Sequence, residues 1–148
     1  MEVMIRKAER SDLEKILSLY GQPDMDNGVV LDITAAERLF DKLKQYPDYC
    51  VYVAEINGEA VGTFALAIMD NLGHLGAPSG LIEDVVVAAP LQGKGIGRSM
   101  MEQAINICKG KGCYKVSLSS NLKRENAHRF YEGIGFKKHG YSFLMELI

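Results

Sequence analysis

Apolar residues recur at two spacings along the chain, and these spacings predict which segments are strands and which are helices. A spacing of two, typical of strands, marks residues 49–69 on both sides of Asn57-Gly58, the dipeptide best suited to a tight hairpin turn. Spacings of three and four, typical of helices, mark residues 96–109. The apolar face of that helix would consist of Ile96, Met100, Met101, Ala104, Ile105 and Cys108.

Two further helices are expected before residue 47. A short strand at "EVMIRKA" precedes Ser11 and Glu14, whose spacing is that of a capping box and predicts a helix reaching Tyr20. Thr34 and Glu37 have the same spacing and predict a helix at "TAAERLFDKLKQY". The residues between these helices are rich in Pro, Gly, Asn and Asp, which predicts a loop.

The remaining elements predict a mixed sheet. Leu81 to Val87 is largely apolar on both faces, which is typical of a central strand covered on both sides. After the helix at 96–109, "YKVSLSS" predicts a strand, "RENAHRFYEG" a short helix and "GYSFLMEL" a closing strand. The order β-α-α-β-β-β-α-β-α-β predicts an α/β (α+β) fold with helices on both faces of the sheet.

Length and composition favour a single soluble domain spanning residues 1–148. The chain is 47% apolar and 24% charged, without a low-complexity tract. No apolar run approaches the roughly 18 residues of a membrane helix, and the N-terminus lacks a signal-peptide stretch, so we expect a cytoplasmic protein. The three cysteines lack metal-ligand spacing and suit a reducing compartment, so we expect no metal site.

Charge is divided unevenly along the chain. Residues 1–90 carry 7 Lys and Arg against 15 Asp and Glu, whereas residues 91–148 carry 10 against 4. One half would suit a cation and the other an anion, although surface charge that mixes on folding explains the same numbers. The total charge of −2 and the lack of an aromatic-basic stripe argue against a nucleic-acid partner.

The glycine-rich stretch "LQGKGIGRSM", residues 91–100, follows the central strand and opens a helix. A P-loop would need Lys and a hydroxyl residue after its last glycine, but Gly97 is followed by Arg98 and Ser99. A dinucleotide fingerprint would need a third glycine where the chain has Arg98 or Met100. What remains is a turn of backbone N–H groups at a helix N-terminus, with nearby cations, which suits a diphosphate.

These residues resemble a known family. Gln92 to Gly97 is similar to the Q/R-x-x-G-x-G/A signature of the GNAT superfamily of N-acetyltransferases, and "AHRFYEGIGF" resembles the A-x-x-F-Y-E-x-x-G-F stretch of that family. "IEDVVV" and "GCYK" are also similar to stretches of glucosamine-6-phosphate N-acetyltransferases, although the connection "SSNLKREN" is longer here. Together the segments cover roughly residues 81–136.

The resemblance implies that acetyl-CoA is the co-substrate. Its diphosphate would lie on the glycine turn and its pantetheine in a splay between the "LIEDVVV" and "YKVSLSS" strands. Arg124 stands where many members have a cofactor-contacting Asn. The implied cofactor-binding residues are Val85, Val86, Val87, Gln92, Gly93, Lys94, Gly95, Ile96, Gly97, Arg98, Arg124 and Asn126. The resemblance to the family is also the only basis for expecting a homodimer.

Acetyl transfer to a primary amine favours a general base, because an ammonium with a pKa of about 10.4 is almost fully protonated at pH 7, a penalty of about 4.6 kcal/mol. We expect Glu83 in this role, since it shares a strand face with Val85 and Val87, with Asp84 on the opposite face as the second candidate. The resemblance implies that the Val87 N–H stabilises the oxyanion and that Tyr131 protonates the leaving sulfur.

The sequence therefore predicts an acetyl-CoA-dependent N-acetyltransferase that works by direct transfer in a ternary complex to a small-molecule or peptide amine. Two alternatives stay open. One is an acyltransferase that uses a longer acyl-CoA. The other is a non-catalytic acyl-CoA sensor, in which Glu83, Asp84 and Tyr131 would be idle.

Overall fold

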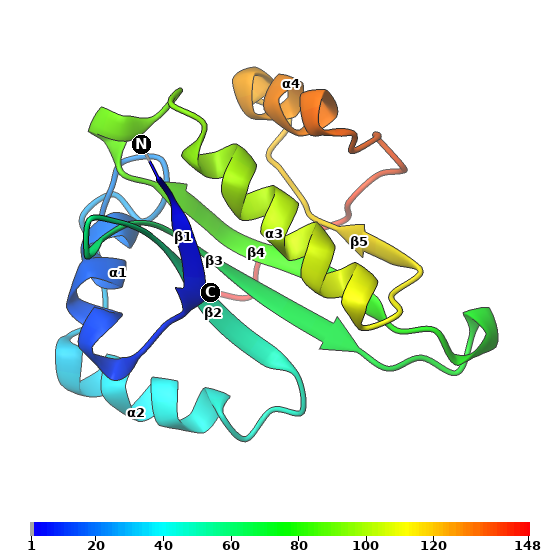
Figure 1. Ribbon diagram of the computed structural model, residues 1–148, viewed down its shortest axis with the longest axis horizontal. Helices are drawn as coiled ribbons and strands as arrows, with labels where there is room; N and C mark the ends of the chain where they lie inside the picture. The colour runs from blue at the N-terminus through cyan, green and yellow to red at the C-terminus, as the bar shows by residue number, and fades with distance from the viewer. Residues whose placement is uncertain (1) are drawn as a thin grey trace. The chain divides into compact units, whose positions relative to one another are not determined.

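The computed structural model describes residues 2–148 and contains a five-stranded mixed sheet (Figure 1). Strands that are consecutive in sequence are neighbours in the sheet, in the order β1-β2-β3-β4-β5. The first three pairings are antiparallel and the pairing of β4 with β5 is parallel. The strands are β1 (Met4–Lys7), β2 (Tyr49–Ile56), β3 (Glu59–Met69), β4 (Ser79–Val87) and β5 (Lys115–Ser117).

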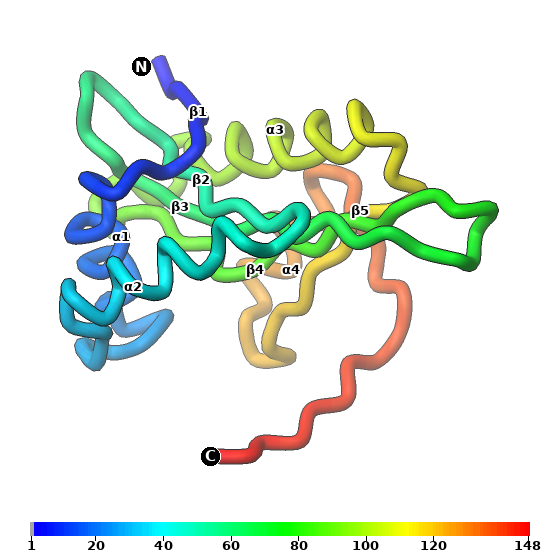
Figure 2. The backbone as a smooth tube through the Cα atoms, turned by 90° about the horizontal axis from the view of Figure 1, so that it is seen from below, coloured from blue at the N-terminus to red at the C-terminus, as the bar shows by residue number. Residues whose placement is uncertain are grey.

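Helices cover both faces of this sheet, as the sequence predicts. Figure 2 shows α3 on one side of the strands and α1 with α2 on the other, and these sides are called the α3 face and the α1 face below. These helices are α1 (Leu13–Tyr20), α2 (Ile33–Leu43) and α3 (Ile96–Gly110). The described part of the chain also contains 3₁₀ turns at Arg10–Asp12, His74–Gly76 and Ala89–Leu91.

The chain divides into two units. The first ends at Ser117 and contains the sheet with its helices, and the second, Leu118–Ile148, contains α4 (Glu125–Ile134). Each unit is described by itself.

The core of the first unit lies on both faces of the sheet. On the α1 face, Ile16 and Val53 are buried together, with Tyr20 packed against them. On the α3 face, the rings of Tyr52 and Phe64 stack with centroids 5.1 Å apart. The α3 residues that are completely or almost completely buried are Ile96, Met100, Met101, Ala104 and Cys108. Five apolar residues of one helix thus cover the sheet, which explains why the periodic pattern identified α3.

The N-terminal caps of α1 and α2 are formed by residues other than the predicted ones. The capping box before α1 pairs Glu9 with Asp12, instead of Ser11 with Glu14, because the chain first makes a 3₁₀ turn. The backbone N–H of Glu9 donates to the Asp12 carboxylate at 2.7 Å. The cap of α2 is Asp32, whose carboxylate accepts from the Ala35 N–H at 2.9 Å, and not Thr34.

The hairpin at Asn57-Gly58 is confirmed, because both residues have positive φ angles, 51° and 81°, as a type I′ turn requires. The predicted closing strand "GYSFLMEL" is wrong, since no residue of 139–148 belongs to a strand. Alternating apolar residues predict a strand, but a strand also needs a hydrogen-bonded neighbour, and the pattern cannot supply one. The strand "YKVSLSS" is shorter than predicted, because β5 ends at Ser117.

Candidate active site

A β-bulge interrupts β4 at the two carboxylates. Ala65 pairs with Glu83 and Thr63 pairs with Val86, so β4 contains one more residue than β3 between these pairs. Asp84 takes up the extra length with a φ of 53°, in the left-handed region that Asp tolerates better than most residues. The bulge therefore changes which side chains of β4 share a face.

The bulge contradicts the expected sharing of one face by Glu83 and Val87. Residues that pair directly across antiparallel strands lie on the same face. Val87 pairs with Gly62, which faces Met100 of α3, so Val87 lies on the α3 face. Glu83 pairs with Ala65, which is three residues after Gly62 in β3. Because successive residues of a strand alternate between faces, Ala65 and Glu83 lie on the α1 face. Glu83 and Val87 are four residues apart, but strict alternation of side chains does not hold through a bulge.

Glu83 and Asp84 both influence Tyr49, which begins β2 on the α1 face. Burial raises the pKa of Tyr49, and the charges of Asp84 and Glu83 raise it further. Burial also raises the pKa of Tyr20, at the end of α1, and Asp84 adds to this effect. Both carboxylates therefore act on groups of the α1 face, Glu83 through its register and Asp84 through its charge near Tyr20 and Tyr49.

The carboxyl group of Asp84 has a perturbed pKa. Although Asp84 is solvent-accessible, partial burial raises the pKa of its carboxyl group, and the negative charge of Asp26 raises it further. A carboxylate whose pKa is raised is a stronger base than one with an ordinary value. Asp26 lies in the loop after α1, so this loop contributes to the electrostatics of the site.

The glycine turn has the geometry of an anion cradle. Gly93 and Gly95 have φ angles of 79° and 88°, and a Cβ added at either would meet no atom within 4 Å, so the turn borders open space. Within residues 2–148, the N–H groups of Gly93, Lys94 and Gly95 donate to no other group. The turn leads into α3, whose first N–H groups also lack intrahelical acceptors. These residues fit a diphosphate.

Side chains of the turn differ in what they can contact. Lys94 is exposed, whereas Ile96 is 1% exposed and can offer only its backbone to a ligand. Arg98 is ion-paired with Glu102 of the same helix, 3.1 Å apart at an exposed position. Such a pair is weak, so Arg98 remains able to turn toward an anion.

Within residues 2–148, no strand pairs with the outer edge of β4 beyond Leu81. β5 pairs only with Ser79, Gly80 and Leu81 and ends at Ser117. The Ala88 N–H donates to the Val61 carbonyl at 2.8 Å, which makes the next pair, Gly62 and Val87, a non-hydrogen-bonded one. The N–H and C=O of Val87 therefore point away from β3, toward the open edge. Val85 and Val86 lie along the same segment.

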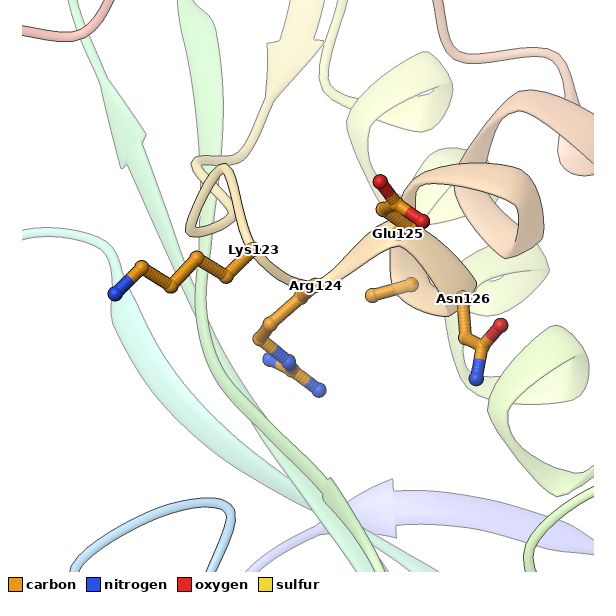
Figure 3. Close-up of a pocket in the computed structure, with 5 residues that line it drawn as sticks. Lys123, Arg124, Glu125 and Asn126 are labelled. Carbon is orange, nitrogen blue, oxygen red and sulfur yellow. The ribbon is translucent and has the colours of Figure 1, made fainter.

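In the second unit, a pocket of about 350 Å³ lies at the start of α4 (Figure 3). Arg124 and Asn126 extend from one side of the backbone and Glu125 from the other. Asn126 accepts a hydrogen bond from Arg129, whereas Arg124 makes no side-chain hydrogen bond within residues 2–148. Of the two predicted cofactor contacts, Arg124 is therefore the more available.

Tyr131 lies on α4 between two other rings. Its ring meets those of Phe130 and Phe136 edge to face, with centroids 5.1 and 5.9 Å away. Burial raises the pKa of the Tyr131 phenol, and the charge of Arg124 acts in the opposite direction. The phenol is therefore protonated at neutral pH, as a proton donor must be.

Three further residues lie at this site that the sequence does not predict there: Tyr20, Tyr49 and Gln22. Both tyrosines stand at the ends of predicted elements, which is a weak signal for a site. The amide of Gln22 donates to the Val87 carbonyl at 3.1 Å and accepts from the Ala89 N–H at 2.9 Å, contacts that no local pattern indicates.

Two classes of feature are not found among residues 2–148. No helix there has both the length and the apolar content needed to cross a membrane. No three His, Cys, Asp or Glu side chains converge in that range as metal ligands would.

Comparison with known proteins agrees with this geometry. The model of the acetyltransferase (GNAT) family matches residues 4–136. Glucosamine 6-phosphate N-acetyltransferase of Trypanosoma brucei brucei is 30% identical over 151 residues, covering 99% of this chain and 97% of the relative. The enzyme of the same name from Arabidopsis thaliana is 33% identical over 135 residues, 88% of this chain and 87% of the relative. The crystal structure of glucosamine-6-phosphate N-acetyltransferase from Arabidopsis thaliana superposes with a TM-score of 0.86 at 27% identity, covering all of both chains.

Proposed function

The chain belongs to the acetyltransferase (GNAT) family, and on this basis we propose that it moves the acetyl group of acetyl-CoA directly to a primary amine in a ternary complex. The observation that carries the proposal is the form of β4. Its bulge brings Glu83 to the α1 face next to Asp84, while the Val87 N–H and the glycine turn that follow offer backbone donors without a partner in residues 2–148.

The glycine turn and the open edge of β4 would hold acetyl-CoA. The N–H groups of Gly93, Lys94 and Gly95 would bind the diphosphate, with Lys94 and Arg98 adding positive charge. The backbone of Val85 and Val87 would pair with the pantetheine, whereas the backbone of Val86, which pairs with Thr63, faces β3. Bound acetyl-CoA supplies an acetyl thioester, whose thiolate leaves readily because a thiol has a pKa of about 8.5. The N–H of Val87, which points away from β3, would donate to the acetyl oxygen.

We place the general base at Asp84, with Glu83 beside it holding the ammonium of the acceptor. Two properties support Asp84: burial and the charge of Asp26 raise the pKa of its carboxyl, and it is the residue that takes up the bulge, with a φ of 53°. A base with a raised pKa competes better for the proton of an ammonium near neutral pH. Tyr131, whose phenol is protonated at neutral pH, would return a proton to the leaving sulfur.

The acceptor would bind on the α1 face, where Tyr20 and Tyr49 adjoin the carboxylates. Negative charge and aromatic rings both attract an ammonium group. The relatives make glucosamine 6-phosphate the first acceptor to test. Unphosphorylated glucosamine, a polyamine and a peptide with a free N-terminus extend the panel to other amines.

Two measurements test the proposal. Calorimetry should show acetyl-CoA binding, and CoA release should accelerate with at least one amine of the panel. Asp84→Asn should lower kcat about 10²- to 10⁴-fold and Tyr131→Phe less, because a thiolate needs little help to leave. Asp24→Asn, an exposed loop acid, is the control.

Other results would select an alternative. Tight acetyl-CoA binding without turnover of any amine would indicate a sensor module. A higher kcat/KM with butyryl-CoA than with acetyl-CoA would indicate an acyltransferase for longer chains. Full activity in Asp84→Asn together with loss in Glu83→Gln would move the base to Glu83.

A further inference from the structure

Gln22 joins two parts of the site that are far apart in sequence. It follows α1, and its side-chain amide reaches the end of β4, 65 residues later. The amide nitrogen donates to the Val87 carbonyl at 3.1 Å, and the amide oxygen accepts from the Ala89 N–H at 2.9 Å. Because a backbone N–H can only donate and a carbonyl can only accept, these partners fix the orientation of the amide.

The contact with Ala89 caps a 3₁₀ turn. Ala89–Leu91 begins after Ala88, which has no side-chain acceptor for the first N–H groups of the turn. Gln22 supplies that acceptor from another part of the chain. The turn leads directly to Gln92, the first residue of the glycine-rich cradle, so the cap also fixes where the cradle starts.

The backbone of Gln22 organises the loop that follows α1, residues 21–28, called the 21–28 loop below. Its carbonyl accepts from the N–H groups of Met25 at 3.0 Å and Asn27 at 3.1 Å, and Gly28 closes the loop onto Gly21 at 2.8 Å. The same loop contains Asp26, whose charge raises the pKa of Asp84. A single residue thus anchors the loop internally and ties it to β4.

We propose that Gln22 is a positioning residue that holds the 21–28 loop in register with the Val87–Ala89 backbone, so that an acceptor bound beside the loop meets the acetyl group in line. This inference rests on the proposed function. Gln92 also donates to the Val87 carbonyl, at 3.1 Å. The position of Val87 therefore survives loss of the Gln22 amide, whereas the two hydrogen bonds that tie the loop to the Val87–Ala89 backbone do not.

Gln22 contacts both Val87 and Ala89, whereas Gln92 contacts Val87 alone, so loss of Gln22 should have a specific kinetic effect. Removing the Gln22 amide should lower amine turnover at least tenfold, because displacing a reactant by about 1 Å can cost as much as 10²-fold in rate. Acetyl-CoA affinity should change by less than about threefold, because Gln92 and the glycine turn remain in place. A loss in kcat/KM for the amine without a loss in cofactor affinity separates positioning from general damage to the fold.

The experiment compares Gln22→Met, which keeps the length of the side chain but makes neither hydrogen bond, with Gln45→Met. Gln45 is exposed and its side chain makes no hydrogen bond within residues 2–148, so this control changes the same atoms without breaking a contact. The readouts are kcat/KM for the best amine of the panel, the acetyl-CoA Kd by calorimetry, and amide hydrogen exchange of the 21–28 loop with and without acetyl-CoA.

A drop in kcat/KM confined to Gln22→Met, at unchanged acetyl-CoA Kd, supports the proposal. Wild-type kinetics in Gln22→Met, or a loss fully explained by a higher acetyl-CoA Kd, overturns it. If the wild-type protein binds acetyl-CoA but acetylates no amine, the proposed function fails and hydrogen exchange decides about Gln22. Acetyl-CoA should then slow exchange in the 21–28 loop of the wild type and not of Gln22→Met, and equal slowing in both overturns the coupling.

Discussion

Gly62 of β3 lies directly beneath Met100 of α3. A Cβ at position 62 would stand 2.8 Å from the Met100 sulfur and 3.3 Å from the Val86 carbonyl oxygen. Both Met100 and Met101 are completely buried, so the sulfur has little space into which it can move. The missing side chain of Gly62 therefore lets α3 pack closely over the sheet, next to the part of β4 that forms the site.

Gly62→Ala should destabilise the protein by about 1–3 kcal/mol, the usual cost of overpacking a core. Chemical denaturation measures this as a lower midpoint at an unchanged slope. Gly110→Ala is the control, because a Cβ at position 110 would meet nothing within 4 Å and alanine favours a helix. Equal stability of both variants would show that α3 is not packed on β3 as described.

Asp12 and Arg6 form a partly buried ion pair with hydrogen bonds of 2.7 and 2.9 Å. Hydrogen bonds from Arg6 hold the pKa of the Asp12 carboxyl below its ordinary value of 3.8, and the Glu9 N–H contributes in the same direction against the opposing effect of burial. Asp12→Asn should therefore lower the free energy of unfolding at pH 7 by about 1.5–3 kcal/mol, the value of a charge-assisted hydrogen bond.

The stabilisation by the Asp12 carboxylate should depend on pH. A carboxyl whose folded-state pKa is lowered stabilises the protein above its unfolded pKa, near 3.8, and loses this effect as the pH falls through the folded-state value. The stability gap between wild type and Asp12→Asn should therefore be constant above about pH 5 and shrink in acid. Asp41→Asn, which breaks an exposed pair with Arg10, should cost less than about 1 kcal/mol. A gap that widens in acid would contradict the assignment.

The sequence predicts most of the fold because local rules decide those elements. The hairpin at Asn57-Gly58 needs two positive φ angles that these residues adopt easily, and α3 needs an apolar stripe that its periodicity contains. The cap of α2 is Asp32 and not the predicted Thr34, because several residues near a helix start can accept the same kind of hydrogen bond. Such shifts of two residues leave the element itself unchanged.

The sequence predicts the glycine turn but not the arrangement of the carboxylates. Glycines that adopt positive φ are visible in a sequence, whereas a bulge depends on the register between two strands. The expected sharing of one face by Glu83 and Val87 is therefore wrong, and no local pattern indicates the contact of Gln22 with Val87, 65 residues away. Long-range pairing decides these features, and one strand alone does not contain that information.

Asp84→Asn should raise stability while it removes activity. Burial and Asp26 raise the pKa of the Asp84 carboxyl, so the folded protein is penalised when this group is ionised. Asparagine removes the charge and tolerates the left-handed backbone that Asp84 adopts, with a φ of 53°. The free energy of unfolding at pH 7 should therefore exceed that of the wild type.

Denaturation at several pH values tests the origin of this gain. For a carboxyl with a raised folded-state pKa, the penalty is greatest at neutral pH and disappears as the pH falls through that raised value toward 3.8. The gain in Asp84→Asn should follow the same course. Asp24→Asn, an exposed neighbour in sequence of Asp26, should show no gain at any pH. A pH-independent gain would indicate backbone relief at position 84 in place of the charge effect.

Gly95→Ala should weaken acetyl-CoA binding, because Gly95 combines a φ of 88° with the N-cap position of α3. Alanine in this conformation costs roughly 1–2 kcal/mol, and relaxing the strain would turn the N–H groups of the turn away from the diphosphate. Calorimetry should show a rise in the acetyl-CoA Kd of about tenfold or more. Gly112→Ala carries the same backbone strain, at a φ of 76°, in a turn beyond the end of α3. It should lose comparable stability while binding acetyl-CoA as the wild type does. If Gly95→Ala binds acetyl-CoA as tightly as Gly112→Ala, the diphosphate does not lie on this turn.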